Sequence, residues 1–187
     1  MTDRSPDSPE KLINPELPEK STWGAGPWLT EPDRLEWRHA GLPCLANRNH
    51  HGVWCGYVAV PPGHPLHGKG YDDVDVEVHG GLTYADRCSE HICHVPQPGE
   101  PDDVWWFGFD CAHAGDFTPG LDAVLRDPRL RKLGLPLPDR EPYDHAAAVA
   151  AHDWTVEVYR TLDYVQAETN RLADQLAALA EVPDADD

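Results

Sequence analysis

Residues 105–116 read WWFGFDCAHAGD, and this stretch changes character halfway along. Its first five residues are aromatic or glycine, which together with the preceding valine predicts a buried strand over 104–110. Alternation places Trp106, Gly108 and Asp110 on one face of that strand and the other aromatic residues on the opposite face. Polar and ionisable side chains then follow closely, at Cys111, His113 and Asp116. A buried strand therefore leads directly into groups that could form a site.

The residues before this strand predict two further parts of an antiparallel sheet. Residues 41–62 contain two short apolar runs on either side of NHHG, which is typical of a β-hairpin. Residues 73–81, DVDVEVHGG, alternate valine with charged residues, which predicts a strand that ends at His79. The stretch 82–103 is predicted to be mostly loop.

The C-terminal part changes its period. Residues 153–180 contain no glycine or proline, and apolar residues recur near helical spacing at Val158, Leu162, Val165, Leu172 and Leu176. This pattern predicts one long amphipathic helix, with a possible break near Thr161. The predicted fold class is α+β, an antiparallel sheet of about four to five strands with the long helix packed on one face.

Length and composition indicate a single domain between two tails. The 187 residues are enough for one ordinary core. Residues 1–22 are rich in proline and charge and poor in apolar side chains, so we expect a disordered tail there and another at 182–187. The domain is expected to span 23–181.

The net charge and the cysteines narrow the functional classes. A formal charge of −18 argues against binding of nucleic acid or of an anionic membrane through a basic patch. No apolar run approaches the ~20 residues of a membrane span, and we expect a cytoplasmic protein. Five cysteines in such a chain favour reduced thiols or metal ligands over a disulfide framework.

Two strand ends predict a metal site. His79 closes one predicted strand, and Asp110-x-x-His113-x-x-Asp116 follows the other. Imidazole and carboxylate groups are the ligand set for zinc, iron or manganese. We expect His79, Asp110 and His113 to be ligands, and Asp116 to be a further ligand or a general base that acts with His113 in catalysis. The alternative is that Asp110 caps a turn and His113 is a half-buried polar residue.

A second cluster offers a structural metal site. CSEHICH, residues 88–94, contains Cys88, His91, Cys93 and His94. Zinc sites usually take pairs of ligands from two separate stretches, so an incidental group of cysteine and histidine in a loop is the alternative.

Several stretches resemble an uncharacterised family of small proteins from bacteriophages and actinobacteria. The resemblance rests on CGYVAVPPGHP, VHGGLTY, ICHVPQPGEPDDVWWFGFDCAHAGD and YRTLDYVQAETNRLADQL, and it spans roughly residues 37 to 180. It implies a phage-related context and assigns no activity and no catalytic residue.

The residues themselves favour a metal-dependent enzyme, and specifically a hydrolase acting on a small molecule or nucleotide-like substrate. Its cofactor would be a divalent zinc, manganese or iron ion, and Tyr84, Trp105 and Trp106 would form the apolar wall of the pocket. A non-enzymatic acidic protein that binds a basic protein partner, such as a phage accessory factor, is the alternative from another class. A domain with structural zinc only is a third.

Overall fold

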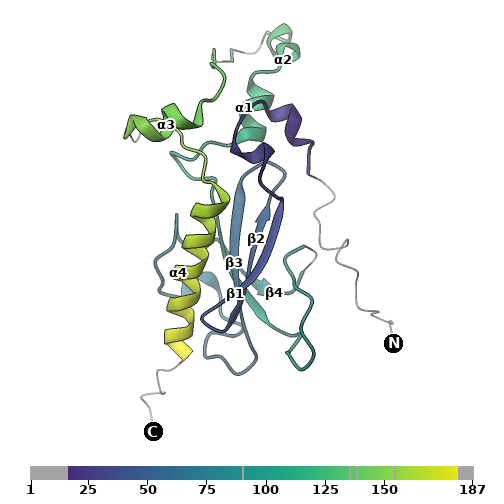
Figure 1. Cartoon of the computed structure of the whole chain (residues 1–187), viewed down its shortest axis with the longest axis vertical. Coiled ribbons are helices and arrows are strands. Elements are labelled where there is room, and N and C mark those ends of the chain that lie inside the picture. The colour runs from purple at the N-terminus through teal and green to yellow at the C-terminus, as the bar shows by residue number, and fades with distance from the viewer. Residues whose placement is uncertain (1–16, 90, 135, 138, 154, 181–187) are drawn as a thin grey trace, which may run out of the picture.

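The architecture was taken from a computed structural model, which describes residues 17–89, 91–134, 136–137, 139–153 and 155–180, without the side chain of residue 131. Five strands form one sheet in the order β1-β2-β3-β5-β4 (Figure 1). The strands are β1 (Arg34–His39), β2 (Leu42–Arg48), β3 (Trp54–Val60), β4 (Tyr84–Arg87) and β5 (Trp105–Asp110). Every pair is antiparallel, and the sheet with its C-terminal helix confirms the predicted α+β class.

The helices lie mainly after the sheet in the chain. They are α1 (Pro119–Leu125), α2 (Pro128–Lys132), α3 (His145–Ala151) and the long α4 (Leu162–Ala180), and short 3₁₀ helices occupy Lys20–Trp23, Pro27–Leu29 and Tyr71–Asp73. Within the described residues, no helix is both long enough and apolar enough to cross a membrane.

The hairpin and the aromatic strand predicted from sequence are confirmed. β2 and β3 pair around the NHHG stretch, with Asn47 opposite Cys55, and β5 pairs with β3, with Phe107 opposite Val58. The flanking strands β1 and β4 were not predicted. The short β4 lies in the stretch 82–103 that was predicted to be mostly loop.

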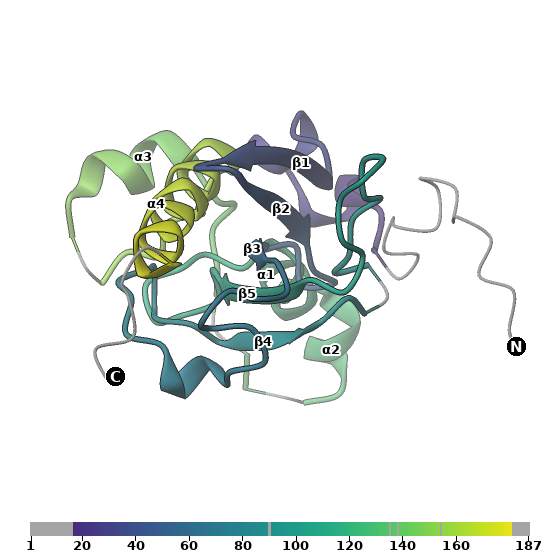
Figure 2. The ribbon, with the colours of Figure 1, turned by 90° about the horizontal axis from the view of Figure 1, so that it is seen from below.

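Helix α4 covers one face of β2 and β3 (Figure 2). Val165, Leu172 and Leu176 of the predicted stripe are fully buried against this face. Gly56 allows the close approach, because a β-carbon there would lie 2.3 Å from Thr169 Oγ1. The helix begins at Leu162, so Val158 precedes it, and the predicted break near Thr161 is its true start.

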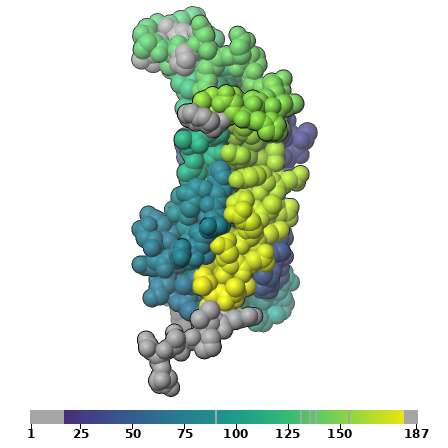
Figure 3. Space-filling model, turned by 90° about the vertical axis from the view of Figure 1, so that its left-hand side faces the viewer, coloured from purple at the N-terminus to yellow at the C-terminus, as the bar shows by residue number. Residues whose placement is uncertain are grey.

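The predicted strand that ends at His79 is not a strand in the structure. Residues 74–78 run beside α4, where this blue segment and the yellow helix lie next to each other in Figure 3. The Glu77 N–H donates to Gln175 Oε1 (2.8 Å), and Gln175 Nε2 donates to Glu77 O (2.9 Å). The valines still pack on the core, so the alternating pattern predicted their burial correctly. The backbone, however, bonds to side chains of the helix and not to a neighbouring strand.

The opposite face of the sheet carries a second, smaller core. Its buried members are Leu45, Cys55, Tyr57, Ala59, Val104 and Trp106. The loop that follows β4 packs there through Ile92 and Cys88, and Cys88 forms a disulfide with Cys93. The expectation that favoured reduced thiols is therefore wrong for this pair, because the tight turn between Ser89 and Ile92 brings the two Cα atoms to 4.7 Å.

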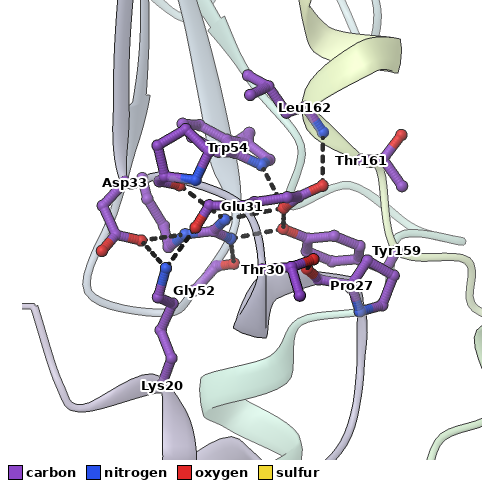
Figure 4. Close-up of polar contacts among 12 residues, drawn as sticks. Lys20, Pro27, Thr30, Glu31, Asp33, Gly52, Trp54, Tyr159, Thr161 and Leu162 are labelled. Atoms are coloured by element: carbon purple, nitrogen blue, oxygen red, sulfur yellow. Dashed lines mark hydrogen bonds and ion pairs between the residues drawn. The ribbon is translucent and has the colours of Figure 1, made fainter.

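A buried ion pair connects the start of α4 to the sheet. The Arg48 guanidinium, whose side chain is fully buried, donates through Nη2 to Glu31 Oε2 (2.9 Å) and lies 4.3 Å from the centre of the Trp54 ring. The same carboxylate accepts hydrogen bonds from Trp54 Nε1, from Tyr159 OH and from the Leu162 N–H, the first residue of α4. Figure 4 shows these contacts converging on Glu31.

Hydrogen bonding keeps this carboxylate charged. Burial alone would raise the pKa of Glu31, but the bonds from Leu162, Tyr159, Arg48 and Trp54 outweigh it and hold the pKa below its ordinary value. Additional contacts fix the guanidinium, since its Nε donates to Asp33 (2.8 Å) and its Nη1 donates to the Gly52 carbonyl (2.9 Å).

The predicted tails fall partly outside the described residues. Residues 1–16 and 181–187 belong to that undescribed part. Residues 17–22, which were assigned to the N-terminal tail, are described, and Lys20 Nζ lies 3.0 Å from Asp33 Oδ1.

Replacement of Arg48 by methionine should destabilise the fold strongly. The substitution keeps a long side chain but leaves Glu31 buried without its cation, which typically costs about 3–5 kcal/mol. Arg38→Met is the matched control, because Arg38 pairs with Glu100 at the surface and exposed pairs contribute about 0–1 kcal/mol. Urea unfolding of both variants measures the difference, and equal losses would show that the buried pair is not special.

Glu31→Gln should weaken the dependence of stability on acid. A carboxylate whose folded pKa is lowered contributes stability above its unfolded pKa, near 4.3, and this contribution is lost as pH falls through the folded pKa. The wild type should therefore lose more unfolding free energy between pH 7 and pH 3 than Glu31→Gln does. Glu36→Gln should keep the wild-type dependence, because the Glu36 side chain is 40% exposed where it pairs with Arg34. An unchanged pH slope in Glu31→Gln would contradict this.

Candidate functional site

Three predicted site residues meet beside α4. His79, His113 and Asp116 each offer one ligand atom, and these three atoms lie within 4.8 Å of one another. His79 follows the segment 74–78, whereas His113 and Asp116 belong to the turn after β5. The two imidazole rings are 5.3 Å apart between centroids, although His79 ends no strand of the sheet. We call these three residues the His–Asp centre.

Asp116 is the most buried member of the centre. Its carboxylate is 1% exposed, and Oδ2 lies 2.7 Å from His79 Nε2 and accepts the His113 backbone N–H (3.0 Å). Oδ1 accepts a hydrogen bond from Arg160 Nε (2.7 Å). The backbone is held as well, because the Phe117 N–H donates to Val158 O and ties the turn to the residues just before α4.

The surroundings of Asp116 favour its ionised form. Burial alone would raise the pKa of Asp116, but the hydrogen bonds from His79, Arg160 and the His113 backbone outweigh it and hold the pKa below its ordinary value. The centre therefore contains a buried carboxylate that carries a negative charge at neutral pH.

Helix α4 orients His79. The Tyr164 hydroxyl lies 2.9 Å from His79 Nδ1, and Glu168 Oε2 accepts the His79 backbone N–H (3.1 Å). Phe109 of β5 packs near the ring, at 6.5 Å between centroids. The imidazole is held on both of its nitrogen atoms, so its orientation in the centre is fixed.

His113 is held less completely. Within the described part of the chain, its Nδ1 is buried without a hydrogen-bond partner and lies 3.7 Å from Asp116 Oδ2. The ring packs against the backbone of Gly80, where a β-carbon would come within 2.1 Å of it. Gly80 also has φ +68°, so a side chain there is excluded both by backbone conformation and by contact.

Asp110 lies apart from this centre. Its Oδ2 accepts a hydrogen bond from Thr83 Oγ1 (2.9 Å), and its Oδ1 accepts the Ala112 N–H (3.0 Å). Asp110 therefore caps the turn after β5, which matches the alternative weighed for it. Strand alternation already placed it with Trp106, on the face away from α4.

The other predicted site residues are also elsewhere. Tyr84 and Trp106 belong to the second core, where Tyr84 packs edge-on against Tyr57, and Trp105 donates through Nε1 to the Lys69 carbonyl. The structural metal site at 88–94 is corrected, because Cys88 and Cys93 use their sulfur atoms in the disulfide. His94 packs edge-on against Trp106, and the backbone carbonyl of His91 accepts a hydrogen bond from Arg34.

Three residues that support the centre were missed in the sequence. Arg160, Tyr164 and Glu168 contact Asp116, the His79 ring and the His79 backbone, respectively. Tyr164 and Glu168 are four residues apart and share one side of α4, which was a usable signal, whereas Arg160 lies just before the helix.

Gly80→Ala should displace the His113 ring, whereas Gly81→Ala should not. Both positions have positive φ, so both substitutions carry a backbone cost of roughly 1–2 kcal/mol. Only at Gly80 does a β-carbon meet the imidazole, because nothing lies within 4 Å of one at Gly81. Nuclear Overhauser contacts between the His79 and His113 rings should be lost in Gly80→Ala and kept in Gly81→Ala. Contacts retained in both variants would contradict the packing described for His113.

Comparisons of the chain with protein-family models, curated proteins and solved structures gave no match. Any function for this chain therefore has to be inferred from the geometry of the His–Asp centre.

Proposed function

We propose that the His–Asp centre binds a divalent transition-metal ion and that the protein is a metal-dependent hydrolase. The observation that carries the proposal is His113 Nδ1, a buried polar atom without a hydrogen-bond partner among the described residues, 3.7 Å from an ionised carboxylate. Leaving such an atom unpaired costs on the order of 1–3 kcal/mol. A cation between His113, His79 and Asp116 would remove that cost.

The donor set fits zinc, iron or manganese. Two imidazoles and one carboxylate are protein ligands of catalytic zinc and of mononuclear iron, and they leave coordination positions open. Arg160 and Tyr164 would orient two of the ligands, as residues behind a metal site commonly do. Asp116 is assigned as a ligand because its Oδ2 faces both imidazoles.

His79 can shift its proton from Nε2 to Nδ1 for this role and keep its hydrogen bond to the Tyr164 hydroxyl. The Asp116 Oδ2 atom, 2.7 Å away, favours the tautomer with the proton on Nε2, in which Nδ1 accepts from the Tyr164 hydroxyl. A ligand Nε2 must be deprotonated, which moves the proton to Nδ1. A hydroxyl can donate or accept, so Tyr164 can bond His79 in both states.

A bound ion would supply Lewis-acid chemistry, polarising a carbonyl or phosphoryl oxygen and acidifying a water molecule. The chain contributes the fixed positions of the ligands, and Arg160 neutralises part of the charge on Asp116. The His113 side chain is 32% exposed, so the centre reaches solvent on that side.

Purified protein should take up one equivalent of zinc, manganese or iron, and His113→Ala should weaken that uptake most. Tyr164→Phe removes only an orienting hydroxyl, so it should cost about 10–100-fold in affinity, and His113→Ala should cost more. Asp110→Asn is the matched control and should bind like the wild type, because Asp110 caps a turn away from the centre. Elemental analysis and titration with zinc give these affinities.

Thermal melts of the same variants separate a ligand role from a structural one. A purely structural His113 would lower stability on substitution and leave metal content unchanged. Protein that carries no metal and takes up none from zinc, manganese or iron would contradict the proposal. That result would favour the alternative function, an acidic protein with charge −18 that binds a basic protein partner.

A further inference from the structure

A cavity adjoins the residues that support the His–Asp centre. It has a volume of about 300 Å³ and is lined by residues of α3, of the chain before α4 and of the first turn of α4. Two of these lining residues contact the centre, since Arg160 donates to Asp116 and the Tyr164 hydroxyl bonds His79. A molecule in the cavity would therefore contact two residues that hold the proposed metal ligands in place.

Arg160 presents unused hydrogen-bond donors at this cavity. Its only hydrogen bond to the described residues uses Nε, so its two terminal amino groups are unpaired, and its side chain is 30% exposed. The guanidinium lies 5.0 Å from the centre of the Tyr164 ring, and this contact helps to fix its plane. A fixed guanidinium with two free amino groups suits an oxyanion that accepts both.

Two further side chains add donors around the same space. His145 contacts the Tyr143 hydroxyl through Nδ1 (3.1 Å), and its Nε2 has no hydrogen-bond partner among the described residues. The Thr161 hydroxyl accepts a weak hydrogen bond from the Tyr164 N–H (3.5 Å), so its own hydrogen is available. Val149 and Val158 line the same cavity and offer an apolar surface.

We propose that this cavity binds a phosphoryl group and that the substrate is a phosphate ester with a small apolar part. The arginine and threonine approach from the segment just before α4 and the histidine from α3, and a tetrahedral anion has enough oxygen atoms to accept from all three. A planar carboxylate would satisfy the guanidinium alone. This inference rests on the proposed function, because it makes the phosphate ester the substrate of the hydrolase.

The test measures binding of inorganic phosphate to metal-free full-length protein by calorimetric titration. The wild type should bind phosphate, Arg160→Met should weaken the affinity at least about tenfold, and His145→Gln should weaken it several-fold. His152→Gln is the matched control, because His152 is exposed at the end of α3 and does not line the cavity. It should bind phosphate as the wild type does.

Two further titrations, with acetate and with zinc, complete the test. Acetate that binds as tightly as phosphate, or phosphate binding that is unchanged in both Arg160→Met and His145→Gln, would overturn the inference. Zinc uptake is measured separately in the wild type and in His145→Gln, which contacts no proposed ligand. Zinc uptake without phosphate binding would leave the proposed function standing and remove this site. Phosphate binding that depends on Arg160 and His145 supports the site even where zinc uptake fails.

Discussion

The buried ion pair between Arg48 and Glu31 holds the architecture together. A guanidinium without solvent is tolerated only when its charge and its donors are matched, and Glu31, Asp33 and two carbonyls supply that match. The same carboxylate receives the Leu162 N–H, so the pair decides where α4 begins. Since α4 carries Tyr164 and Glu168, the position of His79 depends in turn on this ion pair.

Much of the fold follows from local patterns. The apolar runs around NHHG, the aromatic stretch before Asp110 and the apolar stripe of the C-terminal segment each correspond to an observed strand or helix. The alternating valines at 74–78 reported which side chains are buried but not which partner covers the backbone. Alternation has the same appearance whether the neighbour is a strand or the polar side chains of a helix, so this distinction is absent from the sequence.

The centre was predictable in its residue types and only partly in its membership. His79, His113 and Asp116 were all predicted from their positions at strand ends. Asp110 was grouped with them, although the alternation of side chains along β5 places it on the other face of the sheet. The chain reverses after Cys111, and this turn carries His113 and Asp116 toward α4 while Asp110 remains with Thr83. The contribution of α4 could be recognised only after the helix had been placed, and the Cys88–Cys93 disulfide depends on a turn that spacing does not reveal.

The backbone of residues 74–79 is attached to α4 by side chains of the helix. The free energy of opening this segment is therefore set by different contacts from those that hold the strands. Releasing it breaks contacts with Gln175, Arg171 and Glu168 but no hydrogen bond of the sheet ladder. Its valines also pack on the main core, so opening of the segment would cost both these bonds and that apolar contact. His79 lies at the end of this segment, so such an opening would remove one imidazole from the centre and leave the carboxylate in place.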